Sequence, residues 1–170
     1  MPVFLTWRLY GSLPKGFAGH LRKWSGDTRK QFLNADRILD AASSCPLWLR
    51  DPETAGCVER AIRRGAELGR FVLRAYVVMP NHVHALLEPL VALQEITNGI
   101  KGASAREANV RLGRTGMPFW QDESFDRWIR DAGQFARTKA YVENNPVKAH
   151  LCARPQDWPW SSAHKEPPLG

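Results

Sequence analysis

Two apolar runs joined by a two-residue turn signal constrain the fold of this chain more than any other feature. The runs are Phe71 to Met79 and His82 to Glu88, and the Pro80-Asn81 pair between them is typical of a turn. So short a connection requires the two strands to pair antiparallel. We therefore predict a β-hairpin, with the second run as a central strand of a sheet.

The second run begins with two histidines, His82 and His84, separated by Val83. Alternate residues of a strand face the same side, so the two imidazoles share one face, about 7 Å apart along the strand, while Val83 faces the core. Such a pair can bind one metal ion and leave positions open, from which the ion polarises a phosphate or carbonyl. The alternative is a solvent-facing strand with two surface histidines, and two nitrogen ligands do not complete a site.

The remaining pattern adds helices and two further strands to the hairpin. The expected strands are Val3 to Tyr10 and Phe119 to Trp128; the expected helices are Thr28 to Ala42, one opened by the N-cap Asp51 and running to about Leu68, Leu93 to Leu112, and Gln134 to Asn144. Cys45 to Leu49 reads as a packed connector. This order predicts an α+β sandwich, a mostly antiparallel sheet with helices packed on it. Residues 11–50 are the least constrained segment, and five prolines predict an irregular tail over 146–170.

Composition favours a single globular domain over residues 1–170 with an anionic partner. The net charge is +7, the pI is near 9.7, and nucleic acid is the commonest partner of so basic a domain. A generic basic protein is the alternative. Three scattered cysteines fit neither a disulfide framework nor a zinc knuckle, which points to a reducing cytoplasm. There is no apolar run of membrane-spanning length and no signal-peptide layout, so we expect no membrane association.

A second candidate group lies near the C-terminus. Tyr141 and Asn145 are four residues apart and so share one face of a helix. Together with the histidine pair they would supply a phenol nucleophile and an amide as third metal ligand. Because Pro146 pushes its preceding residue out of the α region, we expect Asn145 at a frayed helix end. The alternatives are a packing tyrosine and an Asn-Pro pair that stops a helix.

Taken together, these motifs resemble the single-tyrosine HUH transposases, and among them the REP-associated tyrosine transposases. The segments that carry the resemblance are MPNHVH at 79–84, YVENNPV at 141–147 and WPWSS at 158–162, with weaker similarity over most of the chain except 11–50. The resemblance implies a single HUH domain with an RRM-like or ferredoxin-like fold. It implies His82 and His84 as metal ligands and Tyr141 as nucleophile. Insertion-sequence relatives often carry Gln where this chain has Asn145, so the third ligand is the least secure of these assignments.

The implied reaction is the cutting and rejoining of single-stranded DNA. A phenol with a pKa of about 10 is a poor nucleophile at neutral pH, and Mg²⁺ or Mn²⁺ would neutralise charge on the scissile phosphate and position it. Tyr141 would form a 5′-phosphotyrosine and leave a free 3′-OH, with no nucleotide cofactor. The implied substrate is a DNA hairpin of a repetitive extragenic palindrome with single-stranded flanks, bound by a monomer or a homodimer in the bacterial cytoplasm, at the nucleoid.

Several side chains are candidates for holding that DNA, and two other functions remain open. The candidates are Arg8, Lys101, Arg106, Arg111, Arg114, Trp158 and Trp160. The two tryptophans have an equal claim to packing of the tail against the domain. One rival function is a non-cleaving binding module for structured DNA or RNA. The other is a hydrolase that uses metal-bound water, with Tyr141 as a phosphate contact.

Overall fold

The computed structural model of the chain describes residues 1–13, 28–43 and 46–164, with side chains in the second range from residue 32 onward. Cys45 of the expected connector and the Pro167-Pro168 pair lie outside these residues. Four antiparallel strands form one sheet in the order β2-β3-β1-β4. They are β1 (Val3–Leu9), β2 (Phe71–Val78), β3 (His82–Pro89) and β4 (Trp120–Trp128). With the helices that pack on it, this sheet confirms the predicted α+β class.

The predicted hairpin forms the centre of the sheet. Strand β3 pairs with β2 through Val77↔His84 and Val78↔Val83, and with β1 on its other side. The Met79 amide donates to the His82 carbonyl at 2.8 Å and closes the turn. Because β3 has a neighbour on each side and helices above and below, its first six residues are all buried. The central position of the histidine strand is thereby confirmed.

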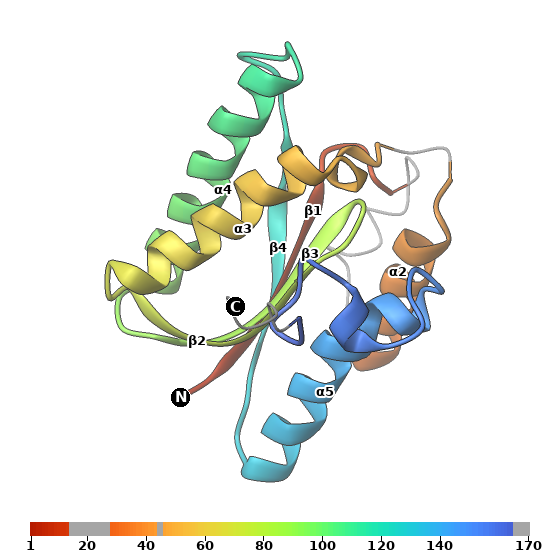
Figure 1. The fold of residues 1–170 in the computed structure, drawn as a ribbon. Coiled ribbons are helices and arrows are strands. Elements are labelled where there is room, and N and C mark those ends of the chain that lie inside the picture. The colour runs from red at the N-terminus through yellow and green to blue at the C-terminus, as the bar shows by residue number, and fades with distance from the viewer. Residues whose placement is uncertain (14–27, 44–45, 165–170) are drawn as a thin grey trace, which may run out of the picture.

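Helices cover both faces of the sheet (Figure 1). Helices α3 (Pro52–Glu67) and α4 (Leu93–Arg111) pack on one face, against alternate β1 residues such as Leu5 and Trp7. Helices α2 (Thr28–Ala41) and α5 (Ala132–Lys148) pack on the opposite face, where Phe4 and Val77 point. The alternation of β1 side chains between the two faces therefore divides the core into two layers. Two short 3₁₀ turns lie at Trp48–Arg50 and Pro155–Asp157.

Helix α5 is longer than the sequence pattern predicted. Its N-cap is Asp131, whose carboxylate accepts the Gln134 amide at 2.7 Å, and the helix continues through Pro146 to Lys148. The expectation that Asn145 lies at a frayed end is wrong: Asn145 is helical and fully buried. A proline inside a helix removes one backbone hydrogen bond and disfavours a helical residue before it. Here the burial of Val142, Asn145 and Pro146 against the sheet outweighs that preference.

The described segment after α5 packs along strand β2. The Val78 amide donates to the Trp160 carbonyl at 2.8 Å, and the Ser162 amide donates to the Tyr76 carbonyl at 2.9 Å. Ser161 also forms a β-bridge with Val77. Residues 160–162 thus cover the outer edge of β2, which would otherwise expose unpaired backbone groups. Within the described ranges, no helix has the length and apolarity needed to cross a membrane.

Candidate metal and tyrosine site

The two histidines of β3 point together into the layer between the sheet and helices α2 and α5. Both side chains are 0% exposed, so the alternative of a solvent-facing strand is excluded. His82 Nδ1 lies 2.7 Å from Asn81 Oδ1, and His84 Nδ1 lies 2.7 Å from Thr6 Oγ1. The Asn81 amide nitrogen donates to the Leu39 carbonyl, so its oxygen is the atom that accepts the Nδ1 proton of His82. This contact leaves the Nε2 lone pair of His82 for another partner.

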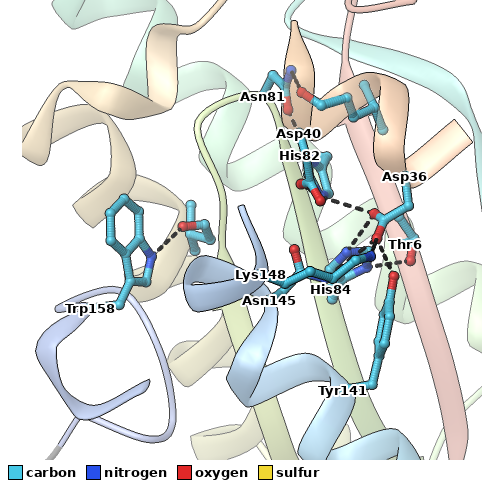
Figure 2. Close-up of polar contacts among 12 residues, drawn as sticks. Thr6, Asp36, Asp40, Asn81, His82, His84, Tyr141, Asn145, Lys148 and Trp158 are labelled. Atoms are coloured by element: carbon cyan, nitrogen blue, oxygen red, sulfur yellow. Dashed lines mark hydrogen bonds and ion pairs between the residues drawn. The ribbon is translucent and has the colours of Figure 1, made fainter. Parts of the chain in front are cut away.

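Asp36 of α2, which was not predicted from the sequence, places a carboxylate oxygen opposite this lone pair, so two acceptors face each other where a cation would suit both. Its Oδ1 atom lies 3.0 Å from His84 Nε2 and 3.3 Å from His82 Nε2 (Figure 2). All three side chains are buried, and none of these three atoms has a hydrogen bond of acceptable geometry among the described residues. Two ligand atoms that each lie about 2.1 Å from an ion, at right angles to each other, are about 3.0 Å apart. The two Asp36 distances are close to this value and all three donor atoms lie within 4.8 Å of one another, so together they form a candidate site for one metal ion.

Electrostatics keep the Asp36 carboxylate charged. Burial alone would raise the pKa of Asp36, but the facing imidazoles of His84 and His82 lower it well below its usual range. Asp40, one helical turn later, has its Oδ1 atom 3.9 Å from His82 Nε2. Burial raises the pKa of Asp40 to about 6; His82 and Lys148 oppose this rise, and the charge of Asp36 adds to it. One firmly ionised carboxylate thus lies beside one that titrates near neutrality.

The predicted nucleophile meets the same carboxylate through its other oxygen. Tyr141 donates its hydroxyl to Asp36 Oδ2, Asn145 Nδ2 lies 3.4 Å from that atom, and Lys148 Nζ lies 3.5 Å from it. These α5 residues occupy positions i, i+4 and i+7, so they form one stripe of the helix. Burial raises the pKa of the Tyr141 phenol, and the charge of Asp36 raises it further. The resting phenol is therefore protonated and held as a hydrogen-bond donor.

The structure brings four of the predicted site residues together and adds others that were missed. His82, His84, Tyr141 and Asn145 all converge on Asp36, and the Asn145 Oδ1 atom is buried with no hydrogen-bond partner among the described residues. The missed side chains are Asp36, Asp40, Lys148 and Thr6. Two local patterns could have pointed to three of them: Asp36 and Asp40 are spaced i, i+4 on one helix, and Lys148 is seven residues after Tyr141 on another. No local pattern marks Thr6.

Four of the predicted DNA contacts lie on the opposite face of the sheet, with α3 and α4. Lys101 Nζ donates to the carbonyls of Gln121 and Asp122 at 2.7 and 2.9 Å. Arg111 forms an ion pair with Glu53, and the Arg114 guanidinium lies 4.2 Å from the Trp48 ring centre. Arg106 lines a groove between α3 and α4. Lys101, Arg111 and Arg114 thus already have partners within the protein.

The other three predicted DNA contacts have different surroundings. Arg8 is opposite His82 in the β1–β3 register, is 8% exposed, and has its Nη1 atom 3.5 Å from Ser12 Oγ. The Trp158 indole donates to the Val78 carbonyl at 2.9 Å and packs on the α5 side of the core. Trp160 packs on the other side. The contacts of Trp158 and Trp160 are those of a tail packed against the domain, which is the alternative role considered for the two tryptophans.

Fold and site together define an α+β protein with a buried His-His-Asp cluster that faces a tyrosine on a packed helix. Residues 48–145 match the family described as Transposase IS200 like. The chain belongs to this family of IS200-like transposases.

Individual relatives agree with the resemblance read from the motifs. The chain is 26% identical over 100 residues to a REP-associated tyrosine transposase of Escherichia coli (strain K12). The match covers 56% of each chain, so the protein spans about half the length of this relative. A solved structure, a REP-associated tyrosine transposase bound to a REP hairpin, has a similar fold. That likeness has a TM-score of 0.59 at 18% identity and covers 96% of this chain and 76% of the other.

Proposed function

We propose that this protein is a metal-dependent single-strand DNA endonuclease that cuts and rejoins hairpin DNA through a 5′-phosphotyrosine on Tyr141. The observation that carries the proposal is the shared carboxylate: Asp36 contacts the two histidines with one oxygen and the tyrosine with the other. A tyrosine beside a metal-ligand set puts a nucleophile close to an ion that would bind and position a phosphate. The names of the E. coli relative and of the hairpin-bound structure support hairpin DNA as the substrate.

The donor set indicates which residues would hold the ion. His82 Nε2, His84 Nε2 and Asp36 Oδ1 would be the ligands, and Asn145 Oδ1, which has no hydrogen-bond partner among the described residues, is a further candidate. Two imidazole nitrogens fit Mn²⁺ better than Mg²⁺, which prefers oxygen ligands. When bound, the ion supplies charge neutralisation at the scissile phosphate.

The protein's own residues then carry out the exchange of bonds. The Tyr141 hydroxyl loses its proton and its oxygen forms a bond to phosphorus, while the bond from phosphorus to the 3′ oxygen breaks. The 3′ oxygen takes up a proton to give a 3′-OH, so the step releases no net proton. Asp36 Oδ2 orients the phenol by accepting its hydrogen bond. A cation bound by Asp36 would offset the negative charge that helps to raise the phenol pKa, and a lower pKa makes the phenol easier to deprotonate. The 3′-OH can later attack the phosphotyrosine, so rejoining needs no external energy source.

A gel assay with hairpin oligonucleotides tests the proposal against its rivals. Oligonucleotides from palindromic repeats of the protein's own genome, labelled at the 5′ or the 3′ end, are incubated with Mn²⁺ or EDTA and denatured. We expect a metal-dependent protein adduct with the 3′-side fragment only, lost in His82→Ala and His84→Ala while hairpin binding persists. Two free DNA ends would instead indicate the water mechanism. Binding without cleavage for every repeat would indicate the binding module.

A further inference from the structure

A cavity of about 350 Å³ opens beside Tyr141, between α2, α5 and strand β4. Its volume lies in the range of small-ligand sites. The residues that give it chemical character are Phe4, Phe32, Phe125, Arg127, Arg137 and Tyr141. We call this cavity the tyrosine pocket. It adjoins the proposed nucleophile and is separate from the metal-ligand atoms, which do not line it.

Aromatic rings form one wall of the tyrosine pocket. Phe32 and Phe125 stack with ring centres 4.6 Å apart, and Phe4 lies 6.3 Å from Phe125 and 6.1 Å from Tyr141. The sheet register explains the convergence, because Phe125 is opposite Thr6 and Arg127 is opposite Phe4, so all four side chains share one face. Flat aromatic surfaces of this kind bind unpaired nucleobases by stacking, whatever the base.

Two arginines make the pocket positively charged. Arg127 lies on β4, and Arg137 lies on α5 one helical turn before Tyr141. Both are exposed, and among the residues that the structure describes neither guanidinium forms an ion pair. This distinguishes them from Arg111, which is paired with Glu53. A free guanidinium beside an aromatic wall is suited to a phosphate whose base occupies the wall.

We propose that the tyrosine pocket binds one unpaired nucleobase next to the scissile phosphate, with Arg127 and Arg137 holding the adjoining backbone phosphate. The position of the scissile phosphate rests on the proposed function of Tyr141, but base binding can be measured without cleavage. A cavity of about 350 Å³ admits a single base and excludes a duplex stem. The pocket would thereby place the single-stranded flank, not the paired stem, across the tyrosine.

Fluorescence of 2-aminopurine tests the proposal directly. This base analogue replaces one nucleotide at a time in the single-stranded flanks of a hairpin oligonucleotide, which is mixed with the full-length protein in EDTA to prevent cleavage. We expect severalfold quenching at one or two adjacent positions. Phe125→Leu, which keeps an apolar side chain but removes the ring, should restore the fluorescence and weaken binding roughly tenfold. Arg154→Gln, an exposed arginine outside the pocket, is the matched control and should change neither.

Salt dependence tests the two arginines. Each of Arg127→Gln and Arg137→Gln should lower the slope of log affinity against log salt by about 0.7, the value for one phosphate contact on a single strand. Arg154→Gln should leave the slope unchanged. An unchanged slope in both pocket variants would overturn the phosphate contact.

The base contact has its own contradicting outcomes. The proposal fails if no flank position is quenched, if Phe125→Leu quenches like the unmodified protein, or if an abasic site at the quenched position binds equally tightly. These results are independent of chemistry. Position-specific quenching without any adduct would contradict the proposed cleavage and support the pocket, whereas an adduct without quenching would do the reverse.

Discussion

Asp36 connects the two halves of the site at the scale of a single residue. One carboxylate oxygen faces His82 and His84, and the other accepts the hydroxyl of Tyr141. The proposed metal ligands and the proposed nucleophile therefore share one buried carboxylate. The two histidines and the tyrosine were readable from their motifs. Asp36 belongs to no motif: its local signal is the i, i+4 spacing to Asp40, and the tertiary fold brings it to the histidines and the tyrosine.

Removing one charge at Asp36 tests its role as a ligand. We predict that Asp36→Asn lowers the affinity for Mn²⁺ at least tenfold, because ligand removal exceeds the roughly 10–100-fold effect of residues that only orient a ligand. Titration calorimetry with the purified protein measures this without DNA. Asp40→Asn is the matched comparison, since its carboxylate is 3.9 Å from His82 and should matter less. Equal affinity in Asp36→Asn and the unmodified protein would contradict the assignment.

A substitution at Thr6 tests whether a residue that hydrogen-bonds a proposed metal ligand contributes to metal binding. The Thr6 hydroxyl lies 2.7 Å from His84 Nδ1 and fixes the ring orientation. We predict that Thr6→Val, nearly the same in shape, weakens Mn²⁺ binding roughly 10–100-fold, the usual cost of losing such a partner. Thr97→Val on α4, where the hydroxyl only caps a Gln94 carbonyl, is the control and should bind Mn²⁺ normally. If both variants bind alike, Thr6 does not orient the ligand.

At the scale of elements, α5 determines the geometry of the tyrosine. The common orientation of Tyr141 and Asn145 was predictable, because residues i and i+4 share a face in any helix. Both side chains do converge on Asp36. The length of α5 was not predictable, because the preference against a helical residue before proline is a tendency that burial of Asn145 and Pro146 overrides. The extra turn matters, since it brings Lys148 to within 3.5 Å of Asp36.

The N-cap of α5 provides a test of this element. Asp131 accepts the Gln134 amide at 2.7 Å, and we predict that Asp131→Ala lowers the free energy of unfolding by about 1 kcal/mol. Asp131→Asn retains a good capping oxygen and should cost only a few tenths of that. Urea denaturation measures both. A loss in Asp131→Asn as large as in Asp131→Ala would show that the cap is not the cause.

At the scale of the whole molecule, local patterns were predictable and long-range placements were not. The hairpin at Pro80-Asn81 fixed an antiparallel sheet from adjacent residues alone. The docking of α2 over the histidines depends on contacts between segments distant in sequence, such as the Asn81 side chain with the Leu39 carbonyl. The surroundings of Lys101 and Arg111, two predicted DNA contacts, were not predictable for the same reason, since each has a partner within the protein that only the fold reveals.

The C-terminal tail is part of this global packing. Trp158 donates its indole N–H to Val78 and packs against the α5 side of the core. We predict that Trp158→Ala lowers the free energy of unfolding by about 2 kcal/mol, less than a fully buried aromatic because the side chain is half-buried. Thermal and urea denaturation measure the loss. Hairpin affinity below the melting temperature should be unchanged. Weaker hairpin binding at unchanged stability would instead identify Trp158 as a base-stacking residue.

The proposed function depends above all on a covalent bond between Tyr141 and DNA. The chain has three tyrosines, so mass spectrometry of the peptides from the denatured Mn²⁺ reaction can locate the adduct unambiguously. We predict a nucleotide 5′-phosphate on the Tyr141 peptide, absent in Tyr141→Phe and retained in Tyr10→Phe and Tyr76→Phe. An adduct on another residue, or cleavage that persists in Tyr141→Phe, would contradict it.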